Sequence, residues 1–364
     1  LLEDNAEYGY GMFLANQARR DALAVKMNTV KELGSPEAKE LLEDWMAHRN
    51  ESEGTQQRAK KLAAVLEAEK ESVPAFAALI EEKELFVKTS QWMIGGDGWA
   101  YDIGYGGIDH VLASGADVNL LVLDNEVYSN TGGQVSKATP MAAIAKFAAG
   151  GKYMSKKDLG RMAMTYGNVY VAQISSGANA MQTIKAFEEA EKFPGPSLII
   201  AYTPCITHGL AGGMRKSLQE AKDAVQSGYW SLYRYHPDNL EKGKAGLTLD
   251  YKKPDFSLMP AFLRSQVRFS SLEKQFPAVA EQLFAKTVTD AQTRFIAYAD
   301  MSGQGEKIRE KVLNQSQTQV TDDTSQRPVR ERKERLVDPE AEARRLARRA
   351  ERQAKRQETK KEKN

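Results

Sequence analysis

The chain has 364 residues, which is enough for one large or two modest domains, and its apolar content is ordinary for a protein with a packed core. No run of about 18 apolar residues is present, and the first residues lack the basic start and apolar centre of a signal peptide, so we expect neither a membrane span nor a secretory leader. The single cysteine, Cys205, excludes an internal disulfide framework and favours a cytoplasmic protein.

Charge is divided unevenly along the chain. The formal net charge is +2, yet residues 327–364 hold 15 Lys+Arg against 8 Asp+Glu. This basic segment has no interleaved aromatic residues for base stacking, so we predict that 304–364 form a disordered tail or a solvated helix, with no nucleic-acid partner. The chain also begins without methionine and within what reads as a domain, so we expect it to be a fragment.

The first 85 residues read as a loop followed by a helical appendage. Residues 1–14 are rich in Gly and Tyr and are predicted to form a loop, while 15–82 carry apolar residues at helical spacing. Ser35 is predicted to cap a second helix that begins at Pro36, and a break at 50–54 separates it from a third. We predict that this appendage serves packing and carries no chemistry.

Residues 86–236 alternate short apolar strands with helices. The predicted strands cover 92–94, 119–123, 169–174 and 198–202. Such runs of Ile, Leu and Val fit strands that are buried on both faces. The predicted helices cover 99–114, 141–150, 158–166, 179–193 and 213–225. Thr139 is predicted to cap the second of these, and a capping box at 155–158 is predicted to begin the third. The alternation predicts an α/β fold with a parallel sheet covered by helices, on which 237–303 pack as an extension with a helix over 273–295.

Two oxygen-bearing side chains follow the first two predicted strands. Asp97 lies within Gly95-Gly96-Asp97-Gly98, directly after the first strand, and Asn125 follows the second. Ligands bind at the carboxyl ends of the strands in open parallel sheets, so both side chains are expected at one edge. A carboxylate, an amide oxygen and a nearby backbone carbonyl suit Mg²⁺, and the glycines let phosphate oxygens approach the backbone closely. The pattern therefore predicts a site for Mg²⁺ and a diphosphate.

Longer segments around these residues are similar to those of a known family. GGDGWAYDIGYGG, EVYSNTGGQ, SKATP, KFAAGGK and MTYGNVYVA resemble the C-terminal thiamine-diphosphate domain of pyruvate:ferredoxin (flavodoxin) oxidoreductases, and the resemblance covers roughly residues 1–300. It implies that Mg²⁺ is bound by the side chains of Asp97 and Asn125 and by the backbone carbonyl of Val127. It also implies that Gly96 and Gly98 approach the diphosphate.

The resemblance implies roles for two further residues. Asn130 would lie near the reacting carbon of a 2-oxo acid and stabilise the developing oxyanion, although a residue that only shapes the turn fits its spacing equally well. Cys205 would be one thiolate ligand of a [4Fe–4S] cluster, although a lone cysteine is more often a small buried apolar residue. His208 would either tune that cluster by hydrogen bonding or lie on a loop surface.

The implied activity is the conversion of pyruvate and CoA to acetyl-CoA and CO₂, with electrons passed through [4Fe–4S] clusters to ferredoxin or flavodoxin. Three further cluster cysteines and the glutamate that activates thiamine diphosphate in this family have no counterpart in the chain. We therefore expect missing N-terminal domains of the same enzyme, a homodimer, and no activity from this chain alone. Two alternatives stay open, namely a non-redox thiamine-diphosphate decarboxylase or synthase, and a non-catalytic fragment.

Overall fold

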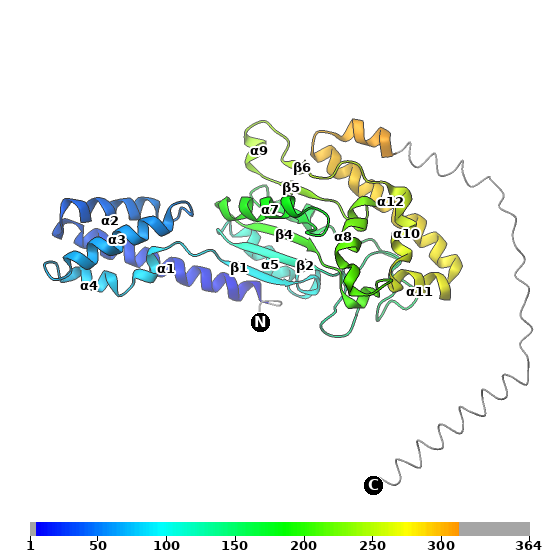
Figure 1. Ribbon diagram of the computed structural model, residues 1–364, viewed down its shortest axis with the longest axis horizontal. Coiled ribbons are helices and arrows are strands. Elements are labelled where there is room, and N and C mark those ends of the chain that lie inside the picture. Colours follow the sequence, from blue (N-terminus) through cyan, green and yellow to red (C-terminus); the bar gives the residue numbers. More distant parts are fainter. Residues whose placement is uncertain (1–4, 313–364) are drawn as a thin grey trace, which may run out of the picture. The chain divides into compact units, whose positions relative to one another are not determined.

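A mixed six-stranded sheet organises the computed structural model, which describes residues 5–312 of the chain (Figure 1). Its strand order is β1-β2-β4-β3-β5-β6. The strands are β1 (Trp92–Gly96), β2 (Asn119–Asp124), β3 (Tyr170–Ile174), β4 (Ser197–Tyr202), β5 (Tyr233–Tyr235) and β6 (Leu247–Leu249). The first four pair in parallel, whereas β5 and β6 run antiparallel. The predicted α/β fold and its strands are confirmed, and the sheet has an additional antiparallel pair at one edge.

Helices cover both faces of the sheet. They are α5 (Tyr105–Ala113), α6 (Leu159–Met164), α7 (Ala180–Lys192) and α8 (Ser217–Gln226). Apolar residues of α5, α6 and α8 share one buried cluster with Leu120 and Ile200 of the sheet. On the opposite face, α7 packs on Tyr170 and Ile199. The predicted helix over 99–114 is confirmed as two pieces, because a π-helical turn, η3 (Trp99–Ile103), precedes α5.

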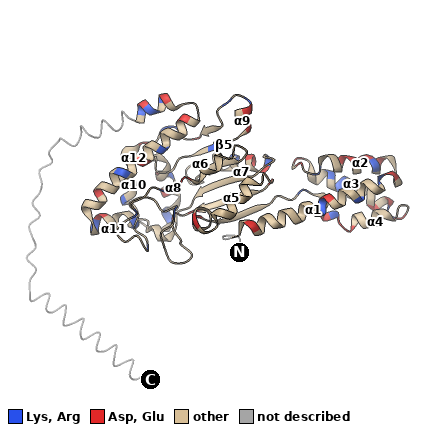
Figure 2. Ribbon diagram, turned by 180° about the vertical axis from the view of Figure 1, so that it is seen from behind, with Lys and Arg blue, Asp and Glu red and all other residues tan. Residues whose placement is uncertain are grey.

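The helical appendage has its own hydrophobic core. Its helices are α1 (Ala6–Val30), α2 (Pro36–His48), α3 (Thr55–Glu69) and α4 (Ala75–Ile80), with the short turns η1 (Lys31–Leu33) and η2 (Lys83–Phe86). Leu42, Trp45 and Phe76 are buried in a cluster confined to this part. The Ser35 hydroxyl accepts a hydrogen bond from the amide of Ala38, which confirms it as the cap of α2. Acidic and basic residues are interspersed along α2 and α3 (Figure 2).

The described chain forms a helix from Ala6, so the prediction of a loop over residues 1–14 is wrong for 6–14, while residues 1–4 lie outside the described residues. Gly9 and Gly11 lower helix propensity, and this misled the sequence interpretation. Ala6 is fully buried, and a Cβ at Gly9 would lie 2.4 Å from Cγ of Met93 in β1. Close packing of α1 against the sheet therefore outweighs the local preference.

The helix predicted over 141–150 is also wrong. Ala142 and Phe147 have φ angles of 70° and 67°, which no α-helix accommodates. The amide of Ala142 donates to the carbonyl of Lys152, and that of Ile144 donates to the carbonyl of Arg268, both at 2.8 Å. These tertiary hydrogen bonds replace the helical ones.

Two of the predicted helix caps differ from the observed ones. Thr139 caps no helix and instead donates its hydroxyl to the carbonyl of Glu126 at 2.8 Å. Asp158, rather than Ser155, caps α6 by accepting from the amide of Arg161 at 3.0 Å.

The last described part packs against the sheet domain. Its elements are η4 (Ile206–His208), η5 (Met214–Lys216), α9 (Asp238–Glu241), η6 (Phe256–Leu258), α10 (Met259–Arg264), α11 (Val267–Gln275) and α12 (Pro277–Met301). Phe256 and Phe295 belong to the main buried cluster. The helix predicted over 273–295 is interrupted at Phe276, because a residue before proline is disfavoured in the helical region. Residues 305–312 are helical, and the rest of the predicted basic tail lies outside the described residues.

Within residues 5–312, no helix combines the length and the apolar character that crossing a membrane requires.

Candidate cofactor and metal site

Three neighbouring strands end at the same edge of the sheet. The order β1-β2-β4 places the segments 97–98, 125–130 and 203–208 side by side at the carboxyl ends of these strands (Figure 1). The amide of Thr203 donates to the carbonyl of Asp124 at 2.9 Å, so the second and third segments are in contact. The loops of Asp97, Asn125 and Cys205, which the sequence analysis identified separately, therefore belong to one region of the fold.

Asp97 is the first residue after β1, and its carboxylate is buried. Only 1% of the residue is exposed, and Oδ2 accepts a hydrogen bond from the Ser136 hydroxyl at 2.8 Å. Burial, reinforced by the negative charge of Asp124, raises the pKa of Asp97 to about 7. Because one hydroxyl is the partner of Oδ2, the carboxylate has unused capacity to bind a cation.

The side-chain amide of Asn125 faces two other oxygens. One of its terminal atoms lies 2.7 Å from Oδ1 of Asp97 and 2.6 Å from the carbonyl oxygen of Val127. If that atom is the nitrogen, it donates to both oxygens. If it is the oxygen, three oxygens converge with no proton between them. The second orientation is favourable only when a cation lies between the oxygens.

The fit of Mg²⁺ to these three groups follows from their spacing. Oxygens on neighbouring vertices of an octahedral Mg²⁺ site lie roughly 2.9 Å apart, because the Mg–O distance is about 2.0–2.1 Å. The separations of 2.6 and 2.7 Å are close to that value. Residues 5–312 hold no group of three or more His, Cys, Asp or Glu suited to a metal ion. A metal at this edge would therefore need the amide and carbonyl oxygens beside the carboxylate of Asp97.

The two glycines beside Asp97 differ in their surroundings. Gly96 is the last residue of β1 and pairs with Leu123 of β2. A Cβ at Gly98 would lie 2.2 Å from a ring carbon of Tyr128, so the aromatic ring occupies the space that a side chain would need. Packing against Tyr128 is therefore sufficient to explain why residue 98 is glycine. Contact of both glycines with a diphosphate stays a prediction.

Asn130 lies in an exposed turn beyond Val127. The amide of Tyr128 donates to the carbonyl of Gln134 at 3.0 Å, and the amide of Gly133 donates to the carbonyl of Tyr128 at 2.7 Å. These bonds close the loop around Asn130, which is exposed. A role of Asn130 toward a substrate stays a prediction.

A cluster of buried charges supports the turn after β2. We call it the buried charge cluster, and it consists of Tyr101, Asp124, Glu126, Lys156, Tyr229 and Arg268. Lys156 pairs with Asp124 at 2.7 Å and with Glu126 at 3.0 Å, and Arg268 pairs with Glu126 at 2.6 Å. Burial alone would raise the pKa of Glu126, but Lys156 and Arg268 lower it to about 2. Two carboxylates and two cations balance one another in this cluster, as buried charges require.

Sequence reasoning missed the buried charge cluster. Glu126 and Lys156 belong to the segments EVYSNTGGQ and SKKDL, but nothing in either segment marks its charge as buried. Arg268 lies 142 residues from Glu126. The one available signal was the density of charged and aromatic residues around strands that are otherwise apolar.

The loop after β4 carries Cys205 and His208. Cys205 is a half-buried free thiol directly before η4. His208 is fully buried, and its Nε2 lies 2.6 Å from the carbonyl oxygen of Asn125. Burial, with Arg268 as the next cause, lowers the pKa of His208 to about 3, so its ring is neutral. His208 is therefore not a loop-surface residue, and tuning of a cluster by it stays a prediction.

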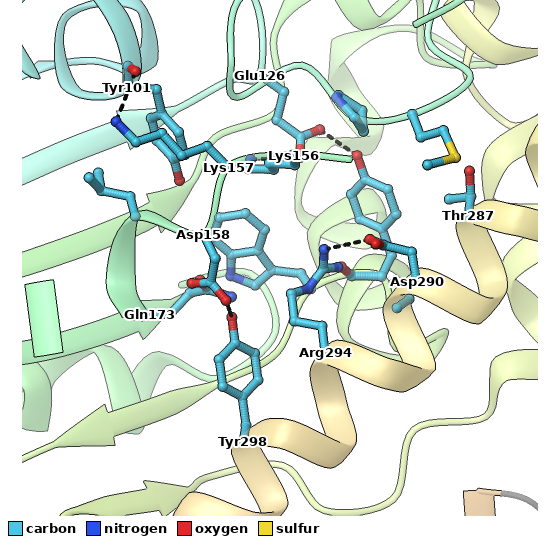
Figure 3. Close-up of a pocket in the computed structure, with 16 residues that line it drawn as sticks. Tyr101, Glu126, Lys156, Lys157, Asp158, Gln173, Thr287, Asp290, Arg294 and Tyr298 are labelled. Atoms are coloured by element: carbon cyan, nitrogen blue, oxygen red, sulfur yellow. Dashed lines mark hydrogen bonds and ion pairs between the residues drawn. The ribbon is translucent and has the colours of Figure 1, made fainter. Parts of the chain in front are cut away.

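Two hollows flank this region. A cavity of about 40 Å³ extends from Glu126 and Lys156 to Asp290 and Arg294 of α12 (Figure 3), which is room for a few water molecules. A groove of about 750 Å³ borders Ser136, the hydrogen-bond partner of Asp97, and includes Lys137, Lys152 and Lys157 among its lining residues. The groove has the size of a small-molecule site, and the cavity does not.

Comparison with known proteins gives a consistent result. Residues 59–201 match the family model described as thiamine pyrophosphate enzyme, C-terminal TPP binding domain. The pyruvate-flavodoxin oxidoreductase of Klebsiella pneumoniae is 54% identical over 305 residues, which are 84% of this chain and 26% of that protein. The pyruvate:ferredoxin oxidoreductase of Moorella thermoacetica is 51% identical over 308 residues, 83% of this chain and 26% of that protein.

Among solved structures, a 2-oxoglutarate:ferredoxin oxidoreductase from Magnetococcus marinus aligns with 40% of this chain and 46% of its own, at 21% identity and a TM-score of 0.30, which is too low to support an argument. The chain spans about a quarter of the length of the curated relatives named above. The matched segment 59–201 includes Asp97, Asn125, Val127 and Asn130 and ends before Cys205. The chain therefore contains a thiamine pyrophosphate-binding domain over residues 59–201, and over more than four fifths of its length it is similar to a part of pyruvate-flavodoxin and pyruvate:ferredoxin oxidoreductases.

Proposed function

We propose that this chain forms the Mg²⁺–thiamine-diphosphate half-site of a pyruvate:ferredoxin or pyruvate:flavodoxin oxidoreductase. The observation that supports it is that one terminal atom of the Asn125 side-chain amide lies 2.7 Å from Oδ1 of Asp97 and 2.6 Å from the carbonyl oxygen of Val127. The whole enzyme would oxidatively decarboxylate pyruvate in the presence of CoA, release acetyl-CoA and CO₂, and reduce ferredoxin or flavodoxin.

In this proposal the chain's residues bind and orient the cofactor. Asp97, Asn125 and Val127 would hold Mg²⁺, which would neutralise the diphosphate, and the backbone at Gly96 and Gly98 would lie near the phosphate oxygens. When bound, thiamine diphosphate supplies the carbanion chemistry that decarboxylates 2-oxo acids. Asn130 donates a hydrogen bond to the substrate oxygen on which negative charge develops.

Electron transfer requires more protein than this chain. A [4Fe–4S] cluster needs four thiolates, and Cys205 is the single cysteine in the sequence. We propose that Cys205 supplies one ligand and that other domains of the same enzyme supply the remaining three, together with the glutamate that activates the cofactor. We further propose that the enzyme is a cytoplasmic homodimer.

The test of the Mg²⁺ site uses the full-length enzyme. Asp97→Ala is expected to abolish pyruvate-dependent reduction of a low-potential dye, because the metal loses its one charged ligand. Asp300→Ala, which removes an exposed carboxylate paired with Arg309, is the matched control and is expected to leave the rate unchanged. Retention of activity by Asp97→Ala would contradict the proposal.

A second variant separates the redox enzyme from a non-redox decarboxylase. Cys205→Ser in the full-length enzyme is expected to lower the iron content and to stop dye reduction while thiamine diphosphate still binds. If iron content and dye reduction are unchanged, the role of Cys205 is wrong. Release of acetaldehyde without dye reduction in the unmodified enzyme would favour the decarboxylase.

A further inference from the structure

We propose that Glu126 is a positioning residue whose buried carboxylate fixes the turn that presents Asn125 and Val127 to the metal ion. The inference rests on the proposed function and extends it to a residue that binds neither metal nor substrate. The supporting observations are the backbone conformation of Glu126 and the contacts of its side chain.

Glu126 adopts a backbone conformation that is unusual for its type. Its φ angle is 66°, in the left-handed region where a side chain is sterically disfavoured. The residue lies between Asn125 and Val127, so this angle sets the direction of one metal ligand relative to the other. Glycine would adopt the same conformation freely. The presence of glutamate therefore points to a use for its carboxylate.

The carboxylate is bound on both oxygens. Oε2 accepts from Nη2 of Arg268 and from the hydroxyl of Tyr229, each at 2.6 Å, and Oε1 accepts from Nζ of Lys156 at 3.0 Å. These partners come from α11, from the segment after α8 and from the loop before α6, and Figure 3 shows Glu126 beside Lys156. Glu126 is 1% exposed, so water does not compete for these contacts.

The backbone of the turn is held as well. The amide of Glu126 donates to Oδ1 of Asp124 at 3.1 Å, and its carbonyl accepts from the hydroxyl of Thr139 at 2.8 Å. The preceding carbonyl, of Asn125, accepts from Nε2 of His208 at 2.6 Å. Every polar group of Glu126 thus has a partner, and the turn is held by contacts within the chain rather than by the ion.

A second carboxylate also contacts an arginine and a tyrosine, but it does not lie beside the candidate metal ligands. Glu189 of α7 pairs with Arg234 at 2.5 Å and accepts from the hydroxyl of Tyr170 at 2.9 Å. It therefore shares with Glu126 a contact with arginine and a contact with tyrosine. Glu189 lies in the last turn of a helix on the other face of the sheet, so its loss affects stability without changing the turn after β2.

The test is a titration of the 364-residue chain with Mn²⁺ in the presence of thiamine diphosphate, with free Mn²⁺ measured by EPR. Glu126→Gln is expected to raise the dissociation constant at least tenfold, and Glu189→Gln is expected to change it less than twofold. Thermal unfolding of both variants measures the stability that each of them loses. Arg268→Lys, which keeps a cation near Glu126, is expected to give an intermediate affinity.

Three results of the Mn²⁺ titration would overturn the inference. They are an unchanged Mn²⁺ affinity in Glu126→Gln, an equal loss of affinity in Glu189→Gln, and full affinity in Glu126→Gly, which would mean that φ alone matters. Because the chain is proposed to form only half of the cofactor site, absence of Mn²⁺ binding by the unmodified chain would move the same titration to the full-length enzyme, where absence of binding would contradict the proposed metal site. Hydrogen exchange of the amides of 124–130 is measured in the same samples, and unchanged protection in Glu126→Gln would overturn the inference even in that case.

Discussion

Nε2 of His208 donates a hydrogen bond to the backbone carbonyl of Asn125 at 2.6 Å, although 83 residues separate them. A carbonyl oxygen only accepts, so Nε2 carries the proton and Nδ1 does not. Burial and the charge of Arg268 lower the pKa of His208 to about 3, which keeps the ring neutral at physiological pH. The loop that carries Cys205 is thereby connected to the loop that carries Asn125.

This hydrogen bond predicts a dependence of stability on pH. The pKa of His208 is about 3 in the folded state and near 6.5 when unfolded, so the unfolded state binds more protons between these values. The stabilisation is complete above pH 6.5 and is lost as the pH falls toward 3. Between pH 6.5 and 4.5, the wild-type protein is expected to lose on the order of 2 kcal/mol more unfolding free energy than the His208→Gln variant. Urea unfolding measures this difference. His48→Gln, at a half-exposed side chain, is the control, and parallel pH profiles for wild type and His208→Gln would contradict the assignment.

The buried carboxylate of Asp97 predicts the opposite pH dependence, in which stability falls as the pH rises. Its folded-state pKa of about 7 lies above the ordinary value of 3.8, so its stability contribution is full below pH 3.8 and is lost as the pH rises through 7. Asp97→Asn is expected to raise the free energy of unfolding at pH 8 by about 1–3 kcal/mol, and by less at pH 5. Urea unfolding in the presence of EDTA measures the difference. An Asp97→Asn protein that is less stable than wild type at pH 8 would show that the buried, ionised carboxylate does not destabilise the fold.

The contact between Gly98 and Tyr128 predicts a pair of coupled substitutions. Gly98→Ala places a methyl group 2.2 Å from the ring and is expected to cost about 1–3 kcal/mol of unfolding free energy. In a Tyr128→Ala background the same change is expected to cost less than about 0.5 kcal/mol, because the obstructing ring is gone. Chemical denaturation of the four proteins measures the coupling. Equal costs in both backgrounds would mean that the ring is not the obstacle.

Trp45 tests whether the helical appendage serves packing alone. It is buried, and its Nε1 donates to the carbonyl of Phe86 at 2.8 Å. Trp45→Phe is expected to lower the free energy of unfolding by about 1–2 kcal/mol, because the carbonyl loses its partner. Mn²⁺ affinity is expected to stay unchanged, and a changed affinity would give the appendage a part in the site.

The strands and several caps could be predicted from the sequence because their causes are local. Continuous apolar runs identified β1 to β4, and Ser35 before Pro36 marked the start of α2. Asp97 and Asn125 could be predicted as neighbours because both follow parallel strands. These features depend on residues that lie within a few positions of one another.

The remaining features depend on contacts between distant residues. The pattern of 141–150 is helical, yet its amides bond to Lys152 and Arg268. The left-handed turn at Glu126 is held by Arg268, which no local pattern connects to it. The strand order, which brings the Cys205 loop beside the Asn125 loop, likewise follows from packing.

The order β1-β2-β4 also determines how far apart the ends of β1 and β4 lie. Neighbouring strands lie about 4.8 Å apart, so the ends of β1 and β4 are separated by roughly 10 Å. The first of these strands leads to Asp97 and the last leads to Cys205. A donor held at one loop and an acceptor held at the other would thus extend from strand ends that lie about one helix diameter apart, a distance determined by backbone hydrogen bonding.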